Sequence, residues 1–289
     1  MGTGPVTRYK IYYRQEGDGE WKTEETSGSF VLLTELTDGT AYEVAISLRD
    51  RNGDYADESV PQIVTTACED LVITDLNYTS SSKRAGNASA TVTWSVEGAT
   101  DSCRVLSQSL SLQLLDVLEC GGVPPTVVAT SKVVDVWRDS EKGRKQYRTL
   151  MANSLYNLTL SLNTQTGTYQ RSILIQTVTT RPTGEPMMLK KQLRNKLSIW
   201  VFHWNKPKCS KRNGPINSYH YTVARFRPNK RNTDPVIAEH VADNKIRLRQ
   251  DDERLLPNQQ YVFSVRATTG AGSDDLSSPT TDIQFVPES

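Results

Sequence analysis

The sequence has little of what most enzymes and metal proteins depend on. Its three histidines (His203, His220 and His240) are scattered, and its four cysteines form no Cys-x-x-Cys pair, so no zinc ligand set is present. The nucleophile-elbow, zinc-protease, phosphate-loop and dinucleotide-binding glycine motifs are also missing. We therefore predict that the chain is not an enzyme and that it holds no metal and no cofactor.

Long apolar runs and an excess of one charge are absent as well. The longest apolar stretches, such as the one within Leu197–Trp204, fall well short of the ~20 residues that a membrane-spanning helix needs. The opening residues Met1–Pro5 have no apolar core of a secretory signal. With 34 Lys and Arg against 33 Asp and Glu, the net charge of +1 argues against bulk attraction to nucleic acid.

What the chain does contain is a repeat built around three tyrosines. Tyr42, Tyr156 and Tyr261 each follow a leucine by six residues, and each begins a run that alternates apolar with mostly polar residues. This period of two is typical of a strand with one buried face. Glycine and asparagine turn signals recur at short intervals, and no convincing helical period occurs. The pattern predicts an all-β chain of tandem antiparallel sandwiches.

One part of the chain resembles a known family. Between Trp204 and Pro279 the sequence contains Trp-x-x-Pro, Asn-Gly-Pro-Ile, Tyr-x-Tyr-x-Val, Leu-x-Pro-x-x-x-Tyr-x-Phe-x-Val-Arg-Ala and Gly-x-Gly-x-x-x-x-Ser-x-Pro. This series is similar to the fibronectin type III repeat, which belongs to the immunoglobulin-like sandwiches. The resemblance is strong in the first and third repeats and weak in the second. It implies seven-stranded Greek-key sandwiches, with Trp94 and Trp204 in the cores and the three tyrosines as tyrosine corners.

The repeat predicts three units: unit one at residues 1–66, unit two at 67–180 and unit three at 181–289. An extended, proline-bearing connector, Thr179–Pro186, separates the last two. Unit one begins close to its first matching strand, so we expect it to lack two strands and the full-length protein to continue upstream. Missing strands would expose sheet edges and part of the core.

Three Asn-x-Ser/Thr sequons predict N-glycosylation at Asn77, Asn87 and Asn157, all in unit two. Asn157 follows Tyr156 in an alternating strand, so its side chain should point away from the core. A glycan there would shield that face of the sheet. Together with an even number of cysteines, the sequons favour an oxidising compartment and an extracellular or cell-surface location.

The four cysteines allow three disulfide pairings. In the sandwich that the resemblance implies, Cys68 and Cys103 lie at the same pole, which favours a bond between them. Cys120 would lie near the opposite pole, facing Cys209 of unit three. A bond between these two would lock the units together, and the alternative is that both are free or separately paired.

Charge is unevenly divided among the units. Unit one carries 6 basic and 12 acidic residues, unit two 10 of each, and unit three 18 basic and 11 acidic residues. The basic residues of unit three form either an ordinary solvated surface or a patch for a sulfated glycan or an acidic protein, with nucleic acid less favoured. The candidate patch consists of Lys206, Lys208, Lys211, Arg212, Arg225, Arg227, Lys230 and Arg231.

These features predict a non-catalytic fragment of a cell-surface receptor or adhesion protein, whose repeats contact a protein ligand or another cell-surface partner. The loop Pro207–Ile216 is similar to loops in receptor-type tyrosine phosphatases and neural adhesion molecules. The former resemblance implies a membrane anchor and phosphatase domains beyond Ser289. The alternative is an intracellular structural scaffold of the same repeats, with unused sequons and reduced thiols.

Overall fold

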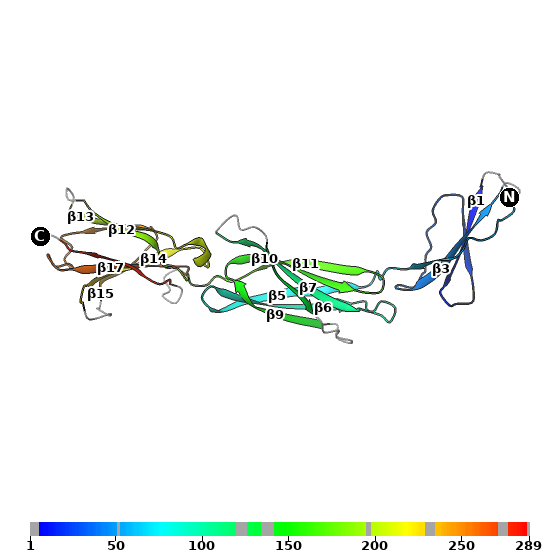
Figure 1. The fold of residues 1–289 in the computed structure, drawn as a ribbon, viewed down its shortest axis with the longest axis horizontal. Coiled ribbons are helices and arrows are strands. Elements are labelled where there is room, and N and C mark those ends of the chain that lie inside the picture. The colour runs from blue at the N-terminus through cyan, green and yellow to red at the C-terminus, as the bar shows by residue number, and fades with distance from the viewer. Residues whose placement is uncertain are drawn as a thin grey trace.

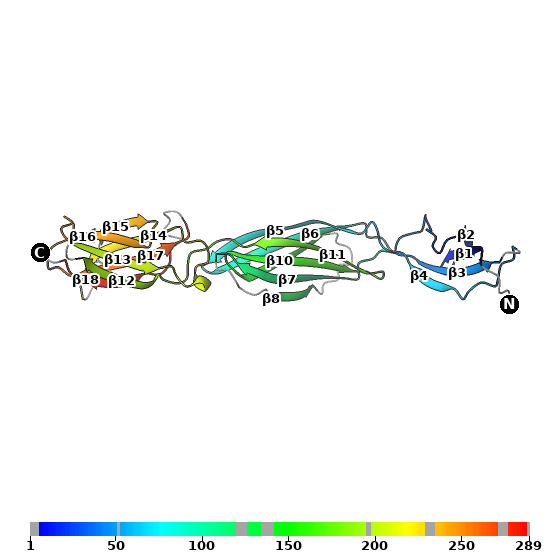
Figure 2. The same cartoon turned by 90° about the horizontal axis from the view of Figure 1, so that it is seen from above.

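The computed structural model describes residues 6–50, 53–119, 126–133, 142–194, 198–228, 235–270 and 277–287. Over these ranges the regular structure is β-strand, apart from one 3-10 turn at Cys209–Lys211. The strands form three groups that follow one another along a single long axis (Figure 1). Seen from above, the groups stay in line (Figure 2). Within the described ranges, no helix has the length and apolar character to cross a membrane.

Unit three contains a complete two-layer sandwich. One sheet has the order β12-β13-β16 and the other β15-β14-β17-β18, with all pairings antiparallel. Aromatic residues fill the space between the sheets, where the ring of Phe202 stacks on Phe263 at 4.2 Å and Trp204 is fully buried. The strands are β12 (Met187–Arg194), β13 (Ile199–Asn205), β14 (Ser218–Arg225), β15 (Pro235–Val241), β16 (Lys245–Arg249), β17 (Tyr261–Thr268) and β18 (Thr281–Phe285).

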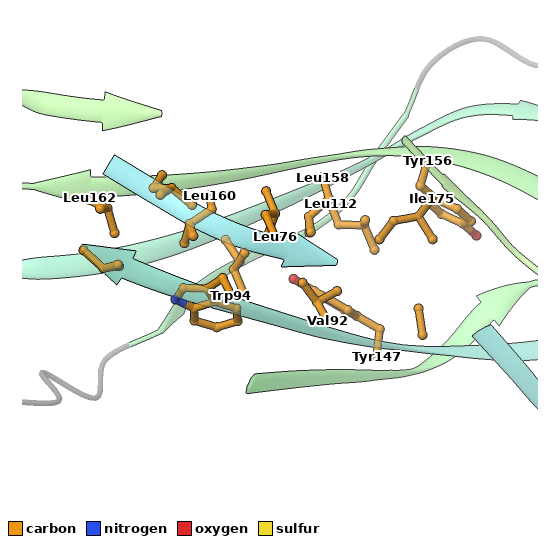
Figure 3. Packing of buried hydrophobic residues seen from close by; sticks show 14 of the residues in the cluster. Leu76, Val92, Trp94, Leu112, Tyr147, Tyr156, Leu158, Leu160, Leu162 and Ile175 are labelled. Carbon is orange, nitrogen blue, oxygen red and sulfur yellow. The ribbon is translucent and has the colours of Figure 1, made fainter. Parts of the chain in front are cut away.

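Unit two repeats this arrangement with the sheets β5-β6-β9 and β11-β10-β7-β8. Leucines from β7 and β10, Trp94 from β6 and Tyr156 from β10 meet in its core (Figure 3). The ring of Trp94 lies against Gly143, where a Cβ atom would come within 2.1 Å of the indole. The strands are β5 (Val72–Arg84), β6 (Asn87–Glu97), β7 (Ser107–Val117), β8 (Thr126–Val133), β9 (Lys142–Met151), β10 (Ser154–Asn163) and β11 (Thr168–Gln176).

Unit one has a single sheet in the described residues, β2-β1-β3-β4, which matches the order β15-β14-β17-β18 of unit three. Its inner face is partly open, because no second sheet of the described residues packs on it, although Ile11 and Tyr13 on that face are buried. Ile46 and Leu48 remain 43% and 41% exposed, whereas the matching Val265 and Ala267 of unit three are fully buried. The strands are β1 (Arg8–Gln15), β2 (Lys22–Thr26), β3 (Ala41–Arg49) and β4 (Gln62–Thr65).

The three tyrosines make the same contact in all three units. A backbone N–H five residues upstream donates to each hydroxyl: Thr37 to Tyr42 at 2.9 Å, Met151 to Tyr156 at 2.8 Å and Leu256 to Tyr261 at 2.8 Å. The bond fastens the loop before each strand to the strand itself. Burial raises the pKa of Tyr156 above its ordinary value of 10.0.

Separate sheets with matching strand order support the division that the sequence predicts. No backbone ladder among the described residues joins the sheets of one unit to those of another. We therefore propose positions 66 and 180 as the domain boundaries.

Candidate binding surfaces and the junctions between the units

A disulfide fastens the end of unit two that faces unit one. Cys68 and Cys103 are bonded, with their Cα atoms 5.7 Å apart and both side chains buried. The amide of Cys68 also donates to the Tyr169 hydroxyl at 2.8 Å, so this entry segment is held to strand β11 as well. Unit two thus presents a covalently closed loop to its neighbour.

Unit one rests on that loop through a tight turn. Gly39 has a φ of +62°, and a Cβ atom at this position would lie 2.4 Å from the Ser102 carbonyl oxygen. Next to it, a carboxylate oxygen of Asp38 accepts a hydrogen bond from the Glu69 amide at 2.9 Å. The close approach requires glycine, because a side chain would meet backbone atoms that cannot move away.

The junction between units two and three is centred on Thr180, which is buried. Its hydroxyl accepts from the Gly86 amide at 2.9 Å, and its own amide donates to the Asn213 carbonyl at 3.0 Å. Its carbonyl accepts from the Thr269 hydroxyl at 2.9 Å. One residue therefore ties the β5–β6 turn of unit two to two separate loops of unit three.

Other contacts leave little empty space between units two and three at this junction. A Cβ atom on Gly214 would lie 2.2 Å from the methyl group of Thr179, so only glycine fits there. The side-chain amide of Asn213 donates to the Arg181 carbonyl at 3.0 Å. The cavity between the two units is only about 50 Å³ in volume, and Asn213 and Gly214 line it. The joint is packed, and it is not a flexible linker.

Cys209 lies at this junction and is disulfide-bonded. Its sulfur is 3.7 Å from the Glu119 carbonyl oxygen of unit two. Cys120 lies outside the described residues, so the bond between Cys120 and Cys209 remains a prediction.

The basic residues of the candidate patch in unit three lie at two opposite ends of that unit. Lys206, Lys208, Lys211 and Arg212 lie between β13 and β14, at the end that faces unit two. Arg225 ends β14, a strand that spans roughly 23 Å, and Arg227 follows it at the far end of the unit. The two clusters do not form one continuous surface. Lys230 and Arg231 lie outside the described residues.

The three sequons are distributed over both faces of unit two. Asn77 and Asn87 are exposed on β5 and β6. Asn157 lies on β10 of the opposite sheet, where its half-exposed side chain alternates with the fully buried Tyr156 and Leu158. All three positions are therefore at the surface of the sandwich.

Sequence reasoning missed two features of these surfaces. The junction contacts of Thr180 join segments that are far apart in the chain, and only the Thr-Thr ending of the unit signalled the position. The cations of β9 also went unnoticed, because the charge of unit two is balanced overall. Within the described ranges, no cluster of three or more His, Cys, Asp or Glu residues is placed to hold a metal ion.

Comparison with known proteins places part of the chain in a family. Residues 192–283 match the family model of the fibronectin type III domain. Unit three is a fibronectin type III domain. The all-β class and the fibronectin type III resemblance are thereby confirmed, and unit two shows the same strand order.

Among solved structures, a crystal structure of the chicken CNTN1 FN1–FN3 domains is similar over 98% of this chain and 90% of that chain. The sequence identity is 14% and the TM-score 0.32, values from which nothing further follows.

Proposed function

We propose that this chain is a non-catalytic, extracellular part of a membrane-anchored receptor or adhesion protein, in which the repeats hold binding surfaces at a fixed spacing. The observation that carries the proposal is the packed joint around Thr180, whose amide and carbonyl bond to Asn213 and Thr269 of unit three while its hydroxyl accepts from Gly86 of unit two. A joint with so many buried polar contacts resists bending, because opening it would leave these groups unpaired. Such a rod suits the presentation of surfaces to a protein ligand or a cell-surface partner.

Two further features support an extracellular location. The bond between Cys68 and Cys103 would be reduced in most cytosolic compartments. All three sequons lie where an attached sugar would extend into solvent.

Secretion tests this proposal against an intracellular scaffold. The chain, placed behind a secretory signal in animal cells, should leave the cell with its disulfides formed. Enzymatic removal of N-linked sugars should then lower its mass. Retention as a reduced, unglycosylated protein would support the scaffold alternative.

The basic clusters of unit three provide a second proposal, that this unit contacts a sulfated glycan. Because the clusters are separated, each can be neutralised on its own in the whole chain. Changing Lys206, Lys208 and Lys211 to glutamine should lower the salt concentration at which the chain elutes from heparin, and changing Arg225 and Arg227 should do so independently. Elution unchanged by either set would refute it.

A further inference from the structure

The outer face of the sheet β5-β6-β9 carries a row of cations that the balanced charge of unit two conceals. Strand β9 contains four Lys and Arg residues and no Asp or Glu. Lys142 and Arg144 are exposed, and they alternate with core-facing positions. Gln146 and Arg148 continue this alternation on the same face, and a β-bulge opposite β6 after Tyr147 leaves Thr149 exposed beside Arg148.

This row continues toward unit three through shallow hollows that share lining residues. The first hollow includes Arg144 and Gln146, and the second includes Gln146, Arg148, Lys83 and Arg84. The third includes Lys83, Arg84 and Arg181. Because each hollow shares residues with the next, they form one continuous surface, which we name the unit-two track.

Among the described residues, few carboxylates lie along the unit-two track. No Asp or Glu occurs from Tyr78 to Val96 or from Lys142 to Gly184, and these two segments supply most of the lining. The ion pairs of the described residues all lie in units one and three. The one lining carboxylate is Asp75, in the hollow farthest from unit three. The track therefore presents a positive potential to solvent.

Most of the other side chains that line the track are polar. Asn77, Thr93 and Ser95 line the first hollow, and Asn87, Ser89 and Thr149 line the second. The one aromatic residue among them, Trp94, is 3% exposed, so no large apolar side chain offers the kind of anchor that protein partners use. Hydroxyl and amide groups spaced between cations match a partner that is itself rich in hydroxyls and bears anions at intervals.

We propose that the unit-two track binds a linear sulfated polysaccharide. From Lys142 to Arg148 the track is about 20 Å long, and the hairpin and linker cations extend it, so it accommodates several sugar residues in an extended chain. The sulfates pair with Lys and Arg, and the sugar hydroxyls bond to the Ser, Thr, Asn and Gln side chains. This binding is separate from the surface proposed in unit three and does not depend on the cellular location of the protein.

A glycan attached to the sequon at Asn87 would block the unit-two track. Asn87 lines the same hollow as Arg84 and Arg148, so a glycan attached there would cover both cations. A glycan on the sequon at Asn77, which lines the first hollow beside Arg144, would act in the same way. Glycosylation at Asn87 and binding of the polysaccharide therefore exclude each other. The binding test consequently uses the whole chain made in the bacterial periplasm, where disulfides form and no N-linked sugar is added.

The experiment measures binding of the chain to immobilised heparin by surface plasmon resonance at about 0.15 M salt. Lys83, Arg84 and Arg148 are all changed to glutamine in the test variant. Lys22, Lys190 and Lys245, which are equally exposed, are changed in the control. We expect the test variant to bind at least tenfold more weakly and the control to stay within twofold. The dependence of log Kd on log salt should fall by about two in the test variant, because fewer counterions are displaced.

Several results would overturn the proposal. An unchanged affinity in the test variant, or an equal loss in the control, would show that the track is not the site. A loss confined to Arg225→Gln/Arg227→Gln would place binding on unit three alone. Equal affinity for polyglutamate would identify an acidic-protein surface instead. If the test variant melts at a lower temperature, the pair Lys142→Gln/Arg144→Gln, on the solvent-facing side of β9, provides the same test.

Discussion

The hydroxyl of Thr269 donates a hydrogen bond to the carbonyl oxygen of Thr180, and this bond crosses from unit three to the end of unit two. It is buried, and it lies beside the two other bonds of Thr180. An angle between repeats is often left to a flexible connector, but here it is fixed by groups that lose their partners when the joint opens.

Replacing Thr180 with valine should loosen this joint. Valine keeps the shape but removes the hydroxyl that fastens Thr180 to the half-buried Gly86 amide within unit two, at a cost of about 1 kcal/mol. The segment whose backbone bonds to Asn213 and Thr269 is then held less firmly to unit two. Small-angle X-ray scattering should show a broader distribution of maximum dimensions. Thr183→Val is the matched control, because both hydrogen bonds of the Thr183 hydroxyl, to Lys211 at 3.5 Å and from Asn213 at 3.2 Å, are exposed and stay within unit three. Identical scattering from both variants would show that the joint does not depend on Thr180.

The first junction should be equally sensitive at Gly39. Gly39→Ala places a methyl group against the Ser102 carbonyl and requires a left-handed φ from alanine, which together cost about 1–3 kcal/mol. We expect faster proteolytic cleavage between units one and two. Gly19→Ala is the control, because nothing lies within 4 Å of a Cβ atom there. Equal cleavage of both variants and the unmodified chain would contradict the prediction.

Tyr156→Phe should destabilise unit two by about 0.5–1.5 kcal/mol, because the part-buried hydrogen bond from the Met151 amide loses its acceptor. Chemical denaturation followed by tryptophan fluorescence measures the change. Tyr12→Phe should change stability little, because the Tyr12 hydroxyl makes no hydrogen bond among the described residues. If both variants are equally stable, the tyrosine corner does not contribute in this unit.

Reduction of the bond between Cys68 and Cys103 should lower the stability of unit two by about 3–4 kcal/mol, as expected for a separation of 35 residues. Thermal unfolding of the Cys68→Ala/Cys103→Ala variant provides the measurement. A shift in Tm of less than a degree would show that packing alone holds the entry loop.

The stability of unit three should depend on pH through Tyr221 and Glu239. Hydrogen bonds from the Tyr221 hydroxyl and from Arg254 lower the pKa of Glu239 below its ordinary 4.5. Its contribution is therefore present above about pH 4.5 and is lost as the pH falls through the lowered value. Burial, followed by the bond to Glu239, raises the pKa of Tyr221, so stability should also fall once the pH exceeds the ordinary value of 10.0.

Glu239→Gln should remove the loss of stability of unit three at acidic pH, because the amide does not titrate. Denaturation measured from pH 3 to 7 should be flatter for the variant than for the unmodified chain. Arg249 and Asp251 form an exposed pair nearby, so Asp251→Asn is a control that should leave most of the slope in place. Parallel profiles for all three proteins would show that Glu239 is not the group responsible.

The repeat could be predicted from the sequence, because the alternation of apolar and polar residues lies within each single strand. Tyr156 and Leu158 show the buried face of β10 within a few residues, and the shared leucine–tyrosine spacing marks equivalent places in the units. The joint at Thr180 could not be predicted from the sequence. Its hydrogen-bond partners Gly86, Asn213 and Thr269 come from three separate turns that are far apart in the chain. The unit-two track escaped notice for a related reason: Lys83 and Arg148 become neighbours only when β5, β6 and β9 pair.

Because its inner face is partly open, unit one should unfold before units two and three. Ile46 and Leu48 stay partly in water, so they forgo much of the roughly 1.5–3 kcal/mol that full burial of such a side chain provides. Amide hydrogens of β1 and β3 should thus exchange with deuterium sooner than those of β10 and β17. A chain that is heated or stretched would lose its amino-terminal repeat first, while the two complete sandwiches remain folded.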